Sequence, residues 1–114
     1  MKQSSQLFKG SLTTIILNLL NHQDKMYGYE ITKKVKELSN GELNLTEGAL
    51  YPALHKLEAE GMLTVSIENI GNRPRKYYSL TQNGTKEVVN KVAELKEFFN
   101  QMQSVLNLQL LPTK

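Results

Sequence analysis

The 114-residue sequence has no cysteine and no tryptophan. The absence of cysteine excludes a disulfide framework and any metal site built on thiolates. The two histidines, His22 and His55, are far apart and lack a ligand pattern, so we expect neither a metal nor a cofactor. No apolar run approaches the ~20 residues of a membrane span, and Thr13, Thr14 and Asn18 interrupt the most apolar stretch. The sequence therefore predicts a cytoplasmic protein with no membrane contact.

Arginine is scarce, and the few basic residues are informative by position. The net charge is only +3 at pH 7, so the surface as a whole is not strongly basic. Both arginines, Arg73 and Arg75, lie beside Lys76, and no acid occurs between Gly71 and Tyr78. A local cluster of this kind suits a phosphate contact, although a solvated basic loop is the alternative. The length allows one domain with a small core.

Apolar residues at helical spacing predict two helices in the first part of the chain. The first runs from about Gly10 to Asn21, with a buried stripe of Leu12, Ile15, Ile16, Leu19 and Leu20. The second runs from about Tyr29 to Ser39, with an inner stripe of Ile31, Val35 and Leu38. Asn40-Gly41 ends it, because both residues tolerate the left-handed backbone of a helix C-cap. The polar segment before Gly28 is expected to form a turn.

A third helix is predicted between Thr46, which caps its start, and Gly61, which ends it. Its buried stripe is Leu50, Ala53, Leu54 and Leu57, and its other face carries Gly48, Tyr51, His55 and Lys56. Pro52 lies inside this helix, where it removes one backbone hydrogen bond at a cost of ~3 kcal/mol. We expect a slight kink there, which serves either packing or contact with a ligand.

Alternating apolar residues after Gly61 predict a β-hairpin. Leu63, Val65 and Ile67 form one face of the first strand, and Tyr78 and Leu80 point inward from the return strand. Residues 69–74 are predicted to join the two strands. The short extended stretch from Glu42 to Leu45 is a candidate edge strand against this hairpin.

The last helix follows Thr81 and runs to about Leu106 or beyond. Its apolar residues are spaced alternately by four and three, which is the pattern of a coiled-coil seam. One small domain offers too little surface to cover so wide a stripe on so long a helix. We therefore predict a homodimer whose interface comprises Leu12, Ile16, Val88, Val92, Leu95, Phe98, Phe99, Met102 and Leu106.

The order helix, helix, short strand, helix, two-stranded wing is that of a winged helix-turn-helix. The predicted fold class is mainly α with a small β-hairpin (α+β), with residues 1–80 as the winged helix-turn-helix and residues 81–114 as a dimerisation helix and tail. Three blocks resemble the PadR family of bacterial transcriptional regulators: Tyr27-Gly28-Tyr29-Glu30-Ile31, then Gly48-Ala49-Leu50-Tyr51-Pro52-Ala53-Leu54, then Arg75-Lys76-Tyr77-Tyr78. Leu57-Glu58 and Gly61 continue the second block, and Leu80-Thr81 and Gly84 continue the third. The resemblance covers about residues 12–99.

The resemblance implies a homodimeric repressor that binds a palindromic operator in double-stranded DNA and dimerises through its C-terminal helix. It also implies that the chain is not an enzyme. The short length resembles the compact branch of the family, in which some members bind flat aromatic drugs between tryptophans at the dimer interface. This chain has no tryptophan. Phe98 or Phe99 is the candidate lining of a similar cavity for a small apolar or aromatic effector.

Candidate DNA contacts come from both helices and the wing. The helix start at Thr46 and Gly48 attracts phosphate through free N–H groups and the helix dipole. Arg73 suits a narrow minor groove. The full predicted set is Tyr29, Lys33, Thr46, Gly48, Tyr51, Pro52, His55, Lys56, Arg73, Arg75, Lys76 and Tyr77.

Each of these residues also has a structural interpretation. Thr46 caps a helix in either case, and Pro52 either touches a thymine methyl or sugar or only kinks the helix. Tyr51 either donates to a phosphate or packs under the wing. Lys33 and Lys56 are alternatively solvated surface lysines. Tyr78 is expected in the core, since it shares a strand face with Leu80.

Two other function classes remain as alternatives. A dimeric winged-helix module that binds protein or a small ligand without specific DNA binding would have the same fold. An enzyme is the weakest interpretation, because the sequence has no Ser/His/Asp set, no phosphate-binding glycine loop and no convincing carboxylate pair.

Overall fold

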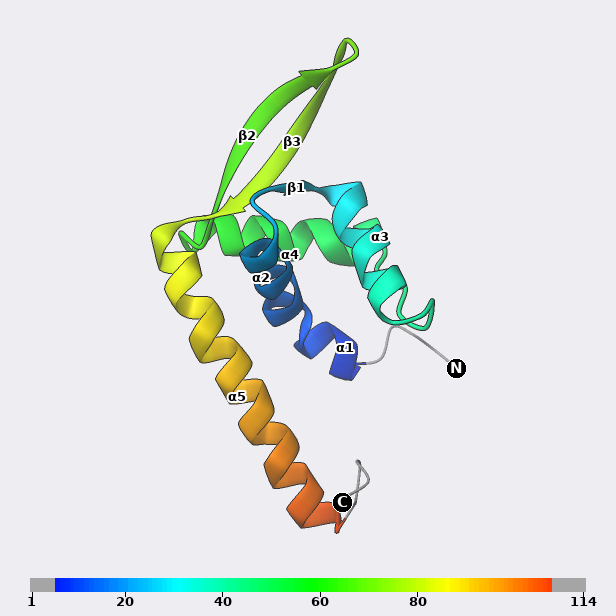
Figure 1. Cartoon of the computed structure of the whole chain (residues 1–114), viewed down its shortest axis with the longest axis vertical. Helices are drawn as coiled ribbons and strands as arrows, with labels where there is room; N and C mark the ends of the chain where they lie inside the picture. The colour runs from blue at the N-terminus through cyan, green and yellow to red at the C-terminus, as the bar shows by residue number, and fades with distance from the viewer. Residues whose placement is uncertain (1–5, 108–114) are drawn as a thin grey trace.

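The computed structural model describes residues 6–107 as a helical body from which a hairpin and one long helix project (Figure 1). The hairpin extends from one end of the body, and the C-terminal half of the last helix extends from the other. The molecule measures 54 × 31 × 26 Å along its principal axes. Its elements in chain order are α1 (Gln6–Gly10), α2 (Leu12–His22), β1 (Met26–Tyr27), α3 (Gly28–Leu38), α4 (Glu47–Ala59), β2 (Leu63–Ile70), β3 (Arg73–Leu80) and α5 (Gln82–Leu106).

The predicted α+β class is confirmed, and the core lies where the helical stripes meet the base of the sheet. The central residues of α4, Leu50 and Leu54, are completely buried, as the spacing predicted. Ile16 and Leu17 of α2 are also completely buried, although Leu17 lies outside the predicted stripe. Tyr78 of β3 is 1% exposed, and burial raises the pKa of its phenol. The apolar faces of the helices therefore pack together with this tyrosine in a single core.

Threonine side chains cap the two longest helices. The Thr46 hydroxyl accepts a hydrogen bond from the Ala49 N–H at 3.2 Å, as predicted. The Thr81 hydroxyl accepts from the Gly84 N–H at 3.0 Å and donates to the Gly61 carbonyl at 2.6 Å. Thr81 thus joins the end of the α4 segment to the start of α5, which sets the direction in which α5 leaves the body.

The third strand of the sheet is β1, which corrects the prediction that residues 42–45 supply it. The sheet order is β1-β3-β2, and Met26 and Tyr27 pair with Tyr78 and Tyr77 of β3. A strand of only two residues is too short to show an alternating pattern, so its sequence was interpreted as a turn. Residues 42–45 instead form a loop whose Leu45 is buried.

The hairpin turn is tighter than predicted. Gly71 and Asn72 alone join the strands, with φ of 55° and 68°. Positive φ at both central residues is the geometry of a type I′ turn, which matches the twist of the two strands. Pro74 belongs to β3, opposite Asn69. Because Ile70 and Arg73 flank a two-residue turn, Pro74 falls in a pair without hydrogen bonds, so its nitrogen faces the outer edge of the strand.

Two apolar residues assigned to buried stripes are exposed. Leu38 is 69% exposed, because α3 ends there and the chain turns away through Asn40 and Gly41, which both have the predicted positive φ. Ile67 is 65% exposed, because β2 extends past the helical body. In both cases the apolar spacing matches the observed helix or strand, but the element extends past the surface that would cover the side chain.

Within residues 6–107, no helix is long and apolar enough to cross a membrane. α5 ends at Leu106, the earliest end that the sequence predicted, and Asn107 follows it as a C-cap in the left-handed conformation with φ of 57°.

Candidate nucleic-acid interface

The face of α4 that points away from the core carries the predicted recognition residues. Leu50, Leu54 and Leu57 fix the opposite face in the core and so orient the helix. On α4 and its N-cap, the exposed members of the predicted DNA-binding set are Thr46, Gly48, Pro52, His55 and Lys56. They present a hydroxyl, an imidazole, an ammonium group and two positions without a long side chain. Such a surface suits close approach to a groove.

Tyr51 lies at the border of this face and packs against α3. Its side chain is half-buried, and its hydroxyl occupies the space where a Cβ at Gly28 would lie. The structure therefore places the Tyr51 hydroxyl over the start of α3, and its contact with a phosphate stays a prediction. Its ring centre is 6.4 Å from that of His55, so it also borders the exposed face of α4.

The register of the hairpin separates its cations between two faces. Arg73, Arg75 and Tyr77 alternate along β3 and so share one face. Lys76 lies on the other face, opposite Ile67 of β2. The predicted set of wing cations is therefore not one surface. The two arginines form a pair, and Lys76 points away from them.

Arg75 stacks on an aromatic ring. Its guanidinium carbon is 4.3 Å from the centre of the Tyr27 ring, which is within cation–π range. The Tyr27 ring also contacts Tyr77 edge-on at 5.4 Å and Tyr29 in a stacked arrangement at 6.3 Å. We call Tyr27, Tyr29 and Tyr77 the tyrosine cluster. It joins the wing to the first turn of α3.

A second cation contact supports the cluster from the β1 side. Lys25 forms a salt bridge with Glu68 of β2, and its ammonium group lies 5.1 Å from the centre of the Tyr77 ring. The hydrogen bond to Glu68 raises the pKa of Lys25. The Glu30 carboxylate accepts from the Tyr27 N–H at 3.1 Å, which holds the start of α3 in place. Because these contacts come from β1, β2, β3 and α3, they limit how the wing can move.

Sequence reasoning missed Lys25, Tyr27 and Glu68 as parts of this surface. Tyr27 was noted only within a family-like block, and no periodic pattern brings together residues 25, 68 and 75. The predicted residues Tyr29 and Lys33 are exposed on α3, with Tyr29 64% exposed. Arg73 is exposed beside the turn of the wing. The nonlocal pairing of β1 with β3 is what creates the site.

The predicted dimer residues fall into two groups. Leu12, Ile16 and Val88 are 5%, 0% and 3% exposed in a single chain, so they belong to its core and offer little surface to a partner. Val92, Leu95 and Met102 are half-buried, while Phe98, Phe99 and Leu106 are exposed. Val89 and Val105, which were not in the predicted set, are 68% and 72% exposed. Among the predicted dimer residues, those that a partner could cover therefore all lie on α5.

Among residues 6–107, no group of three or more His, Cys, Asp or Glu side chains is placed to hold a metal ion.

A helical body, a helix with one exposed polar face and an arginine-bearing hairpin define a winged helix-turn-helix protein of the DNA-binding class. The chain belongs to a particular family within that class. Residues 16–90 match the transcriptional regulator PadR-like family. The family and the relatives below are transcriptional regulators and not enzymes.

Solved structures and a curated relative agree with this assignment. A transcriptional regulator from Clostridium thermocellum is 30% identical with a TM-score of 0.76, over 90% of this chain and 96% of that one. A PadR-like transcription factor from Bacteroides fragilis is 33% identical with a TM-score of 0.72, over 88% and 94%. A transcriptional regulator of Mycobacterium tuberculosis is 31% identical over 83 residues, 71% of this chain and 75% of that protein.

Proposed function

We propose that the chain represses transcription by binding a palindromic operator as a homodimer. The observation that carries this proposal is a chain of contacts from the wing to α4. Arg75 stacks on Tyr27, the next residue Gly28 lies under the Tyr51 hydroxyl, and the Tyr51 ring is close to His55. The arginine face of the wing and the exposed face of α4 therefore flank the same helix start. α4 would enter a major groove while the wing grips the adjacent backbone.

The proposed dimer forms through α5, with residues 1–80 as the reading head and residues 81–114 as the dimerisation segment. The exposed apolar residues of α5 support this proposal because water otherwise covers Val89, Phe98, Phe99 and Val105. Two heads in a symmetric dimer would reach major grooves about one helical turn, ~34 Å, apart. A small apolar effector between the two copies of Phe98 and Phe99 would release DNA by changing that separation.

Gel-shift titration on the DNA upstream of the protein's own gene tests the proposal. If the dimer neutralises on the order of eight phosphates, the logarithm of the association constant falls with log salt at a slope near −7. A slope near zero on that DNA would contradict operator binding.

Arg73→Ala is expected to weaken operator binding on the order of tenfold and to reduce the salt slope by about 1.8, since each of two subunits loses one phosphate contact. Arg73 is chosen because it is exposed beside the turn. Lys96→Ala removes the same charge from an exposed position on α5 and is the matched control. An unchanged slope in Arg73→Ala would show that Arg73 does not neutralise a phosphate.

Tyr27→Leu is expected to weaken binding about fivefold to thirtyfold without changing the salt slope, since a cation–π contact contributes ~0.5–1 kcal/mol and each of the two subunits loses one. The substitution removes no phosphate contact but releases Arg75 from the ring on which it stacks. Hydrogen exchange of the β2 and β3 amides should become faster in the same variant. Tyr27→Phe keeps the ring and should behave as the wild type. A loss of slope in Tyr27→Leu would mean that Tyr27 itself, or Arg75 through it, contacts phosphate.

A further inference from the structure

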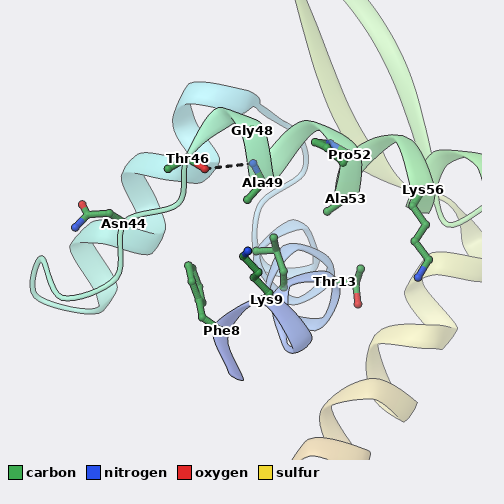
Figure 2. A pocket seen from close by; sticks show the side chains of 11 residues that line it. Phe8, Lys9, Thr13, Asn44, Thr46, Gly48, Ala49, Pro52, Ala53 and Lys56 are labelled. Atoms are coloured by element: carbon green, nitrogen blue, oxygen red, sulfur yellow. Dashed lines mark hydrogen bonds between the residues drawn. The ribbon is translucent and has the colours of Figure 1, made fainter. Parts of the chain in front are cut away.

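A pocket of about 580 Å³ lies between α1, α2 and α4, on the flank of the recognition helix (Figure 2). Phe8 lines it from below, and Ala49 and Ala53 line it from α4 above. Leu12 of α2 also lines it. Small side chains on α4 leave the space open, and this volume is within the ~300–1,000 Å³ range of small-molecule sites. The pocket is separate from the apolar stripe of α5 that carries the proposed dimer.

The charged side chains that line the pocket are all cationic. Among its lining residues there is no aspartate or glutamate, and the two charged side chains are Lys9 and Lys56. The Lys9 side chain rises from α1 toward the first turns of α4, whereas Lys56 descends from α4 at the far end (Figure 2). The first turn of α4 has the partial positive charge of a helix N-terminus, and its one acid, Glu47, is exposed and does not line the pocket. An apolar floor with cations and no carboxylate favours an anionic ligand that has an apolar body.

We propose that this pocket binds an amphiphilic organic carboxylate, with its apolar body against Phe8, Leu12 and Ala53 and its headgroup against Lys9. Lys9 is the chosen partner because Lys56 also lines a neighbouring hollow with Glu60 and Glu87, which compete for its charge. Thr46, Gly48, Pro52 and Lys56 line the pocket and also belong to the proposed DNA face. Ligand and operator therefore exclude each other, and this exclusion alone rests on the proposed function.

Isothermal titration calorimetry with octanoate, 1-octanol and octylamine tests the site, because the three probes share one apolar body. Octanoate should bind at least about tenfold more tightly than octanol, since a hydrogen bond to a charged group contributes ~1.5–3 kcal/mol. Octylamine should bind most weakly. In Lys9→Gln the octanoate affinity should fall to that of octanol, and Lys96→Gln should change nothing. Equal affinities for the three probes, or octanoate binding that Lys9→Gln leaves intact, would overturn the proposal.

Ala53→Phe fills the pocket and should abolish binding of both octanoate and octanol. Its thermal midpoint shows whether it has folded, and Lys9→Gln, at an exposed position, tests the site if it has not. If no probe binds and Ala53→Phe weakens self-association in sedimentation velocity, the pocket is a contact between subunits and the proposal is wrong.

Competition is measured separately by fluorescence anisotropy of labelled operator DNA. Octanoate should raise the apparent Kd for DNA in wild-type protein and not in Lys9→Gln. Octanoate binding in the calorimeter without an effect on DNA would overturn the exclusion but support the site. If the protein binds no DNA at all, the proposed function fails while the calorimetry still decides the ligand site.

Discussion

Replacing Phe98 and Phe99 together with glutamate should convert the proposed dimer to a monomer and weaken operator binding at least about 100-fold, because a second, linked reading head would add roughly 10²–10⁴ in affinity. The two rings are 44% and 52% exposed in a single chain, so the substitution leaves its core intact. Charged groups without partners are strongly disfavoured in an apolar interface. Sedimentation velocity measures the assembly, and a gel shift measures the affinity.

The control adds the same two charges to the opposite side of α5. Asn90 and Asn100 are exposed, and no large apolar side chain lies three or four residues from either along α5, so Asn90→Glu with Asn100→Glu should leave the dimer intact. A dimer that survives Phe98→Glu with Phe99→Glu would show that the subunits meet elsewhere. A monomer that keeps full operator affinity would instead show that one head suffices.

Gly84→Ala should destabilise the protein by about 2–3 kcal/mol. A Cβ at this position would overlap the Met62 carbonyl oxygen, which accepts a hydrogen bond from the Thr81 N–H at 3.0 Å. Relief of the overlap requires either the chain after α4 or the start of α5 to move. Thermal unfolding followed by circular dichroism should show the midpoint falling by roughly 10 °C or more.

Gly48→Ala is the matched control, since it makes the same chemical change inside a helix where space is available. At this position a Cβ would meet only the Thr46 hydroxyl at 4.0 Å. Stability should rise by about 0.5–1 kcal/mol, as alanine favours helix more than glycine does. If Gly84→Ala and Gly48→Ala had equal effects, the close approach of α5 to Met62 would not exist in solution.

The helices and the core of this protein follow from local sequence. Leu50, Leu54 and Leu57 predict the buried side of α4 correctly because one helix repeats every 3.6 residues regardless of its neighbours. Thr46 likewise caps its helix through a bond within four residues. Periodicity cannot show how far a neighbouring element extends, which is why the exposure of Leu38 and Ile67 was not predicted.

The candidate DNA surface was predicted as a set of residues but not as an arrangement. Because side chains alternate along β3, Arg73 and Arg75 lie on one face and Lys76 on the other. Grouping the three residues by their shared positive charge hides this separation. The contact of Arg75 with Tyr27 depends on the pairing of β1 with β3, which is nonlocal and involves only two residues of β1. Likewise, the burial of Leu12, Ile16 and Val88 depends on how α2 packs against α5. These facts require the tertiary structure.

The outward-facing nitrogen of Pro74 has a consequence for the protein at high concentration. Beyond the reach of β1, the wing is a bare two-stranded ribbon with Ile67 and Ile70 exposed, and such ribbons tend to add strands from other molecules. A proline on the open edge of β3 offers no N–H to an incoming strand, and the charges of Arg73 and Arg75 flank it. The hairpin that we propose to lie along a nucleic acid is thereby protected against edge-to-edge pairing with the hairpins of other copies of the chain.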